Sequence, residues 1–242
     1  MPSPLRIAVT AAACAAIAAC GVNRAHSAGP ETSRSFPVGN FSSIEVAGPY
    51  DVQVRTGGKP GVSVKGPEKL VDQMEVEVRG NELRIGQKKD RMFRSMHWGK
   101  GSTVTIEVSA PSLDGAAIAG SGDMNVDKVK GSAFRGSVAG SGSLSVASLE
   151  VNTLKLSIAG SGDIDAAGTA ADADYSIAGS GSVKSPKVTS KTLKASIAGS
   201  GDIRANVTDS ANISIVGSGD VTVTGGAKCN VSKMGSGNAN CS

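Results

Sequence analysis

The chain has 242 residues, of which 32 are Gly and only seven are aromatic (four Phe, two Tyr and one Trp). The glycine share is about twice the usual one, and a compact bundle or sandwich would draw more buried area from aromatic side chains. Collagen is excluded because there is no strict Gly-X-Y period. Wholesale disorder is disfavoured because 39% of the residues are hydrophobic and the net charge is only +4. The composition indicates a repetitive architecture of small residues.

The first residues have the pattern of a secretory signal. One cation, Arg6, precedes a run of small apolar residues that ends at Ala19 and is too short for a typical membrane span. Residues 17–20 read Ile-Ala-Ala-Cys and resemble the lipobox of bacterial lipoproteins, in which the Cys receives a diacylglyceride and becomes the new N-terminus. We therefore expect a lipoprotein signal peptide over 1–19 and lipidation of Cys20. Plain secretion after cleavage further along the chain is the alternative.

The segment that follows is typical of a flexible tether. Residues 20–35 contain Ser, Gly, Pro and charges of both signs. Gly21, directly after the Cys, resembles an outer-membrane sorting signal of Gram-negative lipoproteins. We expect an exported protein that a lipid holds to the outer membrane of a bacterial envelope, facing either the periplasm or the cell surface, with one folded domain over 36–242.

The tripeptide Gly-Ser-Gly recurs seven times from residue 120 onward, at intervals of 18 to 20 residues. Fixed self-similarity of this period is typical of a solenoid. Apolar and polar residues alternate before each copy, as in Leu154, Leu156 and Ile158, which predicts strands with one buried face. We expect both glycines to allow positive φ and hence a sharp corner. The predicted corner glycines are Gly120, Gly122, Gly140, Gly142, Gly160, Gly162, Gly179, Gly181, Gly199, Gly201, Gly217, Gly219, Gly235 and Gly237.

These repeats predict an all-β fold, a single-stranded parallel β-helix with 18–20 residues per rung and strands stacked at ~4.8 Å. We expect a right-handed coil because parallel crossovers are right-handed. Residues 36–85 also alternate and should open the same domain, with a short helical turn between Glu68 and Gln73. A narrow tube of Ala and Gly would explain the shortage of aromatic residues.

Four features of the sequence match one known family. They are the opening Phe-Ser-Ser-Ile strand at 41–44, the Gly-Pro-Tyr-Asp-Val corner at 48–52, the Gly-Ser-Gly-Asp-Ile repeats, and the Cys-containing end from Lys228 to Cys241. With these features, residues 36–241 resemble the putative auto-transporter adhesin head GIN domain family. The resemblance implies a secreted or surface β-helix protein of bacteria and brings no catalytic residues with it.

The repeated polar residues suggest three kinds of site that the spacing does not support. The Asp after the corner is a calcium ligand in some Gly-rich β-helices, but that spacing is absent here, and a polar side chain that bonds its own turn suffices. The corners lack the Lys of a phosphate loop and the Gly-x-Ser-x-Gly of a nucleophile elbow. The uniform rungs leave little loop for the catalytic cleft of a carbohydrate-active enzyme. We therefore predict no metal, no cofactor and no catalysis.

One segment, residues 87–101, interrupts the regular pattern. It holds five cations against one acid. This composition suits a binding loop for a partner, a glycan or anionic lipid headgroups. The other interpretation is a cover whose aromatic side chains pack on the solenoid. Nucleic acid is not an expected partner because there is no wider basic stripe. The candidate binding residues are Lys88, Lys89, Arg91, Phe93, Arg94, His97 and Trp98.

Cys229 and Cys241 fall in the final rung and predict a disulfide in an oxidising compartment.

The sequence as a whole predicts a non-catalytic envelope lipoprotein. Its β-helix would serve as a structural, adhesion or interaction module towards envelope or surface proteins or glycans, as a monomer or a homo-oligomer. The alternative is a ligand- or signal-binding module that uses residues 87–101.

Overall fold

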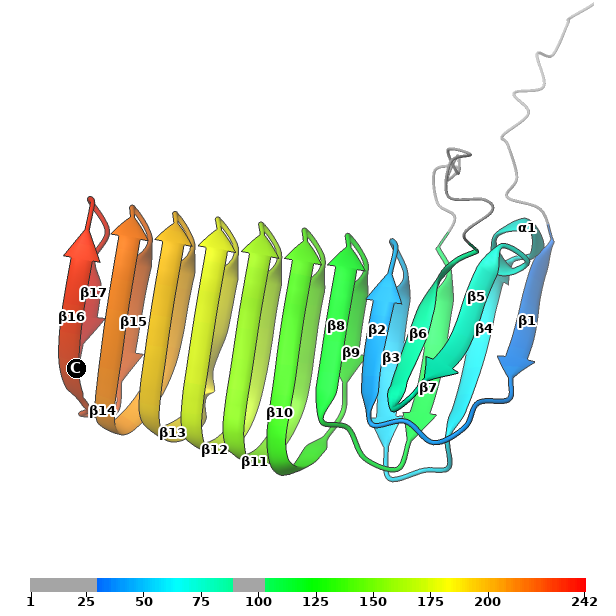
Figure 1. Ribbon diagram of the computed structural model, residues 1–242, viewed down its shortest axis with the longest axis horizontal. Helices are drawn as coiled ribbons and strands as arrows, with labels where there is room; N and C mark the ends of the chain where they lie inside the picture. The colour runs from blue at the N-terminus through cyan, green and yellow to red at the C-terminus, as the bar shows by residue number, and fades with distance from the viewer. Residues whose placement is uncertain (1–29, 89–102) are drawn as a thin grey trace, which may run out of the picture.

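The computed structural model describes residues 30–88 and 103–242, which form an elongated stack of strands (Figure 1). No helix in these two ranges is long and apolar enough to cross a membrane. Within the described ranges the elements are β1 (Glu31–Phe36), β2 (Ser43–Ala47), β3 (Asp51–Thr56), β4 (Gly61–Pro67), α1 (Glu68–Val71), β5 (Met74–Arg79), β6 (Glu82–Gln87), β7 (Thr105–Ala110), β8 (Gly115–Gly120), β9 (Asp123–Val126), β10 (Val129–Gly140), β11 (Ser143–Gly160), β12 (Asp163–Gly179), β13 (Ser182–Gly199), β14 (Asp202–Gly217), β15 (Asp220–Thr224), β16 (Lys228–Met234) and β17 (Ala239–Cys241).

The repeats form the predicted parallel β-helix. β11, β12 and β13 each run from one Gly-Ser-Gly corner to the next and pair in parallel with their neighbours. The register places Gly140 beside Gly160, Gly160 beside Gly179, and Gly179 beside Gly199. Differences in repeat length are absorbed away from the corners, where the register shifts between Val146 and Leu149 and at equivalent places in later rungs. The corners therefore stay aligned along one edge.

Large and small side chains together fill the interior of the β-helix. Phe134 is fully buried two residues before Gly136, and in a later rung the buried Tyr175 follows Ala173 at the same two positions. A Cβ on Gly136 would lie 2.8 Å from a methyl carbon of Leu144 and 2.9 Å from one of Leu156, so the rung that holds Phe134 leaves no room for a side chain at Gly136. The tube therefore accepts aromatic residues, contrary to the expectation that it is too narrow, and Phe134 and Tyr175 each lie beside a small residue.

The N-terminal end has a different, mixed architecture. β1 and β7 both pair antiparallel with β4, and β5 pairs antiparallel with β6. The predicted helical turn is present as α1. The predicted start of the fold at residue 36 is corrected, because β1 already begins at Glu31 within the expected tether. Six residue pairs join β1 to β4, and Arg34 forms a 2.6 Å ion pair with Asp72.

Candidate interaction surfaces

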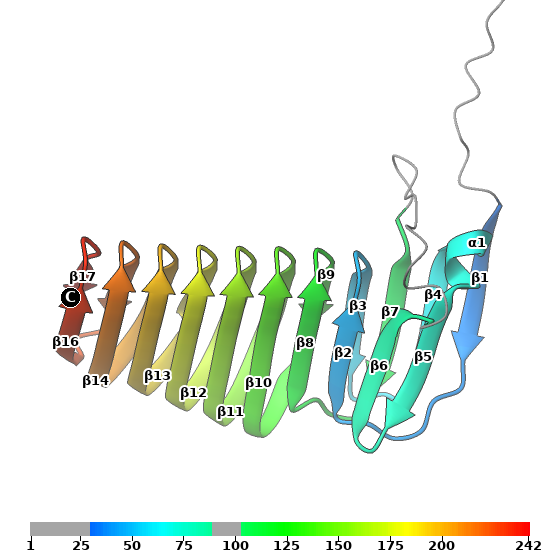
Figure 2. The same cartoon turned by 45° about the horizontal axis from the view of Figure 1, so that its top comes forward.

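The Gly-Ser-Gly corners form one narrow edge of the stack (Figure 2). The first glycine of each corner has a φ between 124° and 135°, which side chains other than that of Gly rarely allow. A Cβ on Gly140 would lie 2.2 Å from the Gly120 oxygen, and one on Gly142 would lie 2.1 Å from the Gly122 oxygen. The prediction that both glycines serve positive φ is therefore wrong for the second. Close backbone contact between rungs requires the second Gly.

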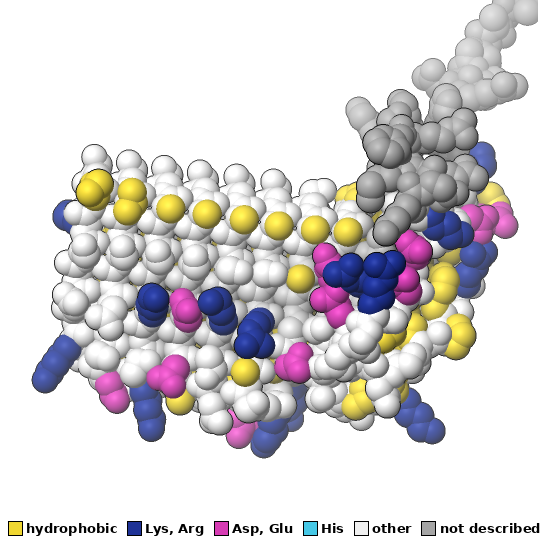
Figure 3. Space-filling view, in the orientation of Figure 1, with side chains coloured by type: hydrophobic (Ala, Val, Ile, Leu, Met, Phe, Trp, Pro, Cys, Tyr) yellow, Lys and Arg dark blue, Asp and Glu magenta, His cyan; other side chains and the backbone are white. Residues whose placement is uncertain are grey.

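Beside this edge runs an exposed row of small apolar side chains, which we call the Ala row. Its members are aligned by strand register, and Figure 3 shows an evenly spaced line of hydrophobic side chains along this face. A parallel row, with Ser137, Ser157 and Ser176 among its members, lies two residues before it in each strand. The result is a flat, uncharged surface that repeats with every rung. The members of the Ala row are Ala119, Ala139, Ala159, Ala178, Ala198, Val216 and Met234.

Two of the Asp residues that follow a corner link neighbouring rungs. The Asp123 carboxylate accepts a hydrogen bond from the Ser143 amide at 3.0 Å, and Asp220 accepts one from the Asn238 amide at 2.8 Å. These bonds reach the next rung, whereas the sequence suggested bonds within the same turn. In residues 30–88 and 103–242, no three His, Cys, Asp or Glu side chains are grouped so that they could hold a metal ion.

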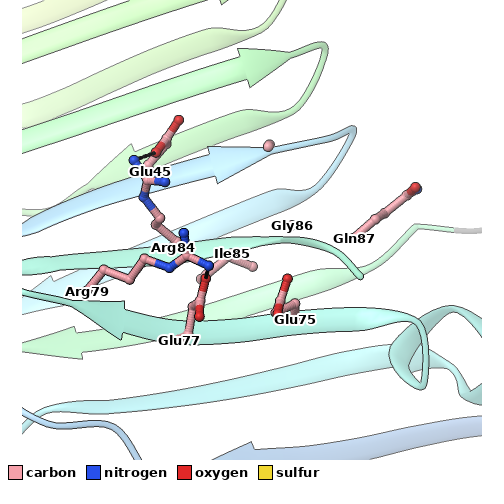
Figure 4. A pocket seen from close by; sticks show the side chains of 9 residues that line it. Glu45, Glu75, Glu77, Arg79, Arg84, Ile85, Gly86 and Gln87 are labelled. Carbon is pink, nitrogen blue, oxygen red and sulfur yellow. Dashed lines mark ion pairs between the residues drawn. The ribbon is translucent and has the colours of Figure 1, made fainter. Parts of the chain in front are cut away.

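A charged groove of about 200 Å³ lies where the β-helix meets the β5–β6 hairpin (Figure 4). The strand register places Arg84 of β6 between Glu45 of β2 and Glu77 of β5. Arg84 donates to Glu45 at 3.1 Å, and Arg79 donates to Glu77 at 2.6 Å. The hollow forms because Gly86, opposite Glu75, has no side chain. The gathered charges are visible at this junction in Figure 3.

The groove is an ion-paired surface with an excess of acid. Its lining holds Glu45, Glu75 and Glu77 against Arg79 and Arg84. A hydrogen bond to Glu82, followed by the charge of Glu45, raises the pKa of the Arg84 guanidinium. Two of the three lining carboxylates are already bound by arginines, so they serve ion pairs within the fold. The groove therefore suits recognition of a cationic or polar group better than acid–base chemistry.

Sequence reasoning missed this groove although a signal for it was present. In Met74–Arg79 the residues Glu75, Glu77 and Arg79 alternate with apolar ones, which places the three on one outer face. The Gly80-Asn81 pair after it has the composition of a two-residue hairpin turn, and Gly80 has a φ of 62°. Together they would have predicted an antiparallel β5–β6 hairpin with a charged face.

Most of the predicted binding loop lies outside the described residues. Gln87 ends β6 and lines the groove. Lys88 follows it, donating its amide to the Gln73 oxygen at 3.0 Å and its Nζ to the Asp72 oxygen at 2.8 Å. The remaining predicted residues, and the predicted lipidation site, lie outside the described ranges: Cys20, Lys89, Arg91, Phe93, Arg94, His97 and Trp98.

The predicted disulfide is present at the C-terminal end. Cys229 of β16 and Cys241 of β17 are joined, with their Cα atoms 6.6 Å apart. The bond links the two strands of the last rung, each of which pairs with the preceding rung on one side. It therefore closes the final rung of the stack.

These features define a class of protein: an extended β-helix whose faces repeat from rung to rung. A family model described as "Putative auto-transporter adhesin, head GIN domain" matches residues 40–227, and the chain belongs to this family. The family resemblance drawn from the sequence motifs is thus confirmed. A comparison with curated proteins finds no match.

Several solved structures share the fold. A "putative adhesin" from Bacteroides fragilis is 24% identical with a TM-score of 0.82, and the match covers 88% of this chain and 97% of that one. A "putative lipid binding protein" from Parabacteroides distasonis is 26% identical with a TM-score of 0.69, over the same shares of the two chains. A "putative adhesin" from Parabacteroides merdae is 21% identical with a TM-score of 0.68, again over 88% and 97%.

Proposed function

We propose that this protein is a non-catalytic adhesion or interaction module of the bacterial envelope, which binds envelope or surface proteins or glycans through the repeated faces of its β-helix. The observation that carries the proposal is the uniform outer surface, because the Ala row and the row of Ser137, Ser157 and Ser176 beside it recur in successive rungs. A flat, repeated, uncharged face fits an extended partner better than a small substrate, which usually needs a concave pocket. The adhesin names of the family and of its structural relatives support the same proposal.

The test is binding of the purified mature protein to glycan arrays and to isolated envelope proteins and polymers. Replacing Ala159 and Ala178 by Lys places two charges on the Ala row, and we expect at least tenfold weaker binding. The matched control replaces the exposed Asn152 and Thr169 by Lys on another part of the same rungs. Failure of the wild-type protein to bind any glycan, polymer or envelope protein would contradict the proposal.

The second part of the proposal is the location. A lipidated Cys20 would tether the fold to the outer membrane through the residues before β1, and multiple acyl chains would hold it firmly. Mass spectrometry of the native N-terminus should find a diacylated Cys20, and Cys20→Ser should release the protein from membranes. An unmodified chain that begins further along would contradict the anchor and leave export intact.

A second candidate function is ligand or signal binding by residues 87–101. The supporting observation is that this segment starts at the charged groove, which Gln87 lines, and that Lys88 donates hydrogen bonds to Asp72 and Gln73 just after α1. In this case Trp98→Ala and Arg94→Ala should each weaken ligand binding, while the Ala-row variants should not. Unchanged binding in the two loop variants would contradict this candidate.

A further inference from the structure

The C-terminal end departs from the repeat in its exposed apolar residues. The Ala row is Ala in five successive rungs and then becomes Val216 and Met234. Within the described ranges, the large hydrophobic residues with high exposure are Val216 at 53%, Val231 at 43% and Met234 at 74%. All three lie in the last two rungs. Large exposed apolar groups gathered in one place mark interaction sites more often than isolated ones do.

The same end presents an open strand edge. β16 pairs with β14 on one side, and in the described part of the chain no strand pairs with its other side. Such an edge offers unpaired N–H and C=O groups that an extended segment can join by adding a strand. The disulfide to β17 holds β16 in place, so the edge is ordered before a partner arrives.

The positive charge of β16 favours some partner segments over others. Lys228 and Lys233 are its charged residues, and it has no acid. Lys233 also occupies the register position of the buried Ile215 and donates its Nζ to the Gly237 oxygen at 3.2 Å. An inward charge at this position opposes continuation of the apolar core by a second copy of the chain. Lys228 and Lys233 are five residues apart and therefore lie on opposite faces of β16. An incoming strand with one acidic side chain on each face would pair with both lysines.

We propose that β16 is a docking edge for an extended segment of a partner protein that carries acidic and apolar side chains. The segment adds as a further strand beside β16, its carboxylates lie near Lys228 and Lys233, and an apolar side chain covers Met234. The edge of β16 adjoins the Ala row, which ends at Met234, but Lys228 and Lys233 lie outside that row. Charge reversal at the two lysines therefore tests this site and not the function proposed for the repeated faces.

The test uses synthetic seven-residue peptides with Glu at the first and sixth positions, opposite Lys228 and Lys233, and Val or Thr elsewhere. The counterpart peptide has Lys at the same two positions. Fluorescence anisotropy on the disulfide-intact protein should show at least tenfold tighter binding of the acidic peptide, with weaker binding at higher salt. The double variant Lys228→Glu, Lys233→Glu should reverse the preference. Met234→Ser should weaken binding of both peptides, and Lys194→Glu, in the middle of the stack, should leave the preference unchanged.

Two outcomes would overturn the proposal. The first is equal affinity for the two peptides, or a preference that the double charge reversal leaves unchanged. The second is self-association of the wild-type protein through this edge, seen by sedimentation as a dimer that Met234→Ser dissociates. Circular dichroism of each variant checks that the β-helix is intact.

Discussion

The corner at residues 48–50 and the seven corners that follow it make the same bend with different residues. Gly48 has a φ of 139°, close to the values of the later first glycines. The position of the second glycine, however, is held by Tyr50, which is almost fully buried. In the later corners the Cβ of the second Gly would point at the carbonyl oxygen of the corner before it, as in Gly122 against Tyr50 at 2.4 Å. No Gly-Ser-Gly corner precedes Tyr50, so a large side chain fits there.

The two glycines of a corner therefore meet different structural requirements, although they look alike in the sequence. The first glycine of a corner satisfies a backbone conformation and is needed in every corner. The second satisfies the contact with the preceding rung and is needed only inside the stack. Regular rungs therefore follow from stacking itself, and irregular features gather at the two ends: the charged groove near β6 and the exposed apolar residues near β16.

The largest expected effect comes from breaking one corner in the middle of the stack. Gly160→Ala would force a Cβ to 2.4 Å from the Gly140 oxygen at a φ of 130°. Strain and overlap together should lower the free energy of unfolding by about 4 kcal/mol. The matched control is Gly131→Ala, whose Cβ meets nothing within 4 Å, and it should change stability by less than ~0.5 kcal/mol. Equal effects in guanidinium denaturation would contradict the stacking account.

The next effect concerns the last rung. Replacing Cys229 and Cys241 by Ser removes a bond that spans 12 residues, which should cost roughly 3 kcal/mol. Because each rung contacts its neighbours only, the loss should be local. Hydrogen exchange should therefore speed up in β16 and β17 while β11 to β13 stay protected. Uniform loss of protection along the whole stack would show that the rungs unfold as one unit.

High pH should destabilise the core through its buried tyrosines, of which Tyr175 lies in the middle of the stack. Burial raises the pKa of Tyr175 to about 12 from an ordinary value of 10.0. Above pH 10 the unfolded chain ionises this phenol while the folded protein keeps it protonated, so stability is full below pH 10 and falls as the pH rises towards 12. The loss should reach about 3 kcal/mol, and Tyr175→Phe should reduce it. A tyrosinate absorbance with every phenol ionising near pH 10 in the folded state would contradict this.

The smallest expected effect concerns Lys233, which distinguishes the last rung from the interior rungs. Lys233→Ile restores the residue type found at Ile158, Ile177, Ile197 and Ile215. The exposed end of the core would then be apolar, and we expect weak, concentration-dependent self-association by sedimentation with little change in stability. Lys194→Ile, in the middle of the stack, is the control that should stay monomeric. Identical behaviour of the two variants would show that Lys233 does not prevent self-association at this end.

Sequence patterns predicted the parts of this fold that repeat. The Gly-Ser-Gly intervals, the alternation around Leu154 and the Cys229–Cys241 pair led to the correct architecture and disulfide, because each reflects a local rule. β1 was missed because its sequence, Glu-Thr-Ser-Arg-Ser-Phe, does not alternate and depends on pairing with β4. The charged groove was missed because Glu45 and Arg84 lie far apart in the sequence and meet only through strand register.

The proposal that the protein works as an interaction module is tested most directly by photo-crosslinking in living bacteria. A photoreactive residue is placed at Ala159 on the Ala row, at Met234 on the C-terminal edge, and at the exposed control position Asn152. The account predicts covalent adducts with envelope components from Ala159 and Met234, and few from Asn152. Adducts at none of the positions, or equal adducts at all three, would contradict it.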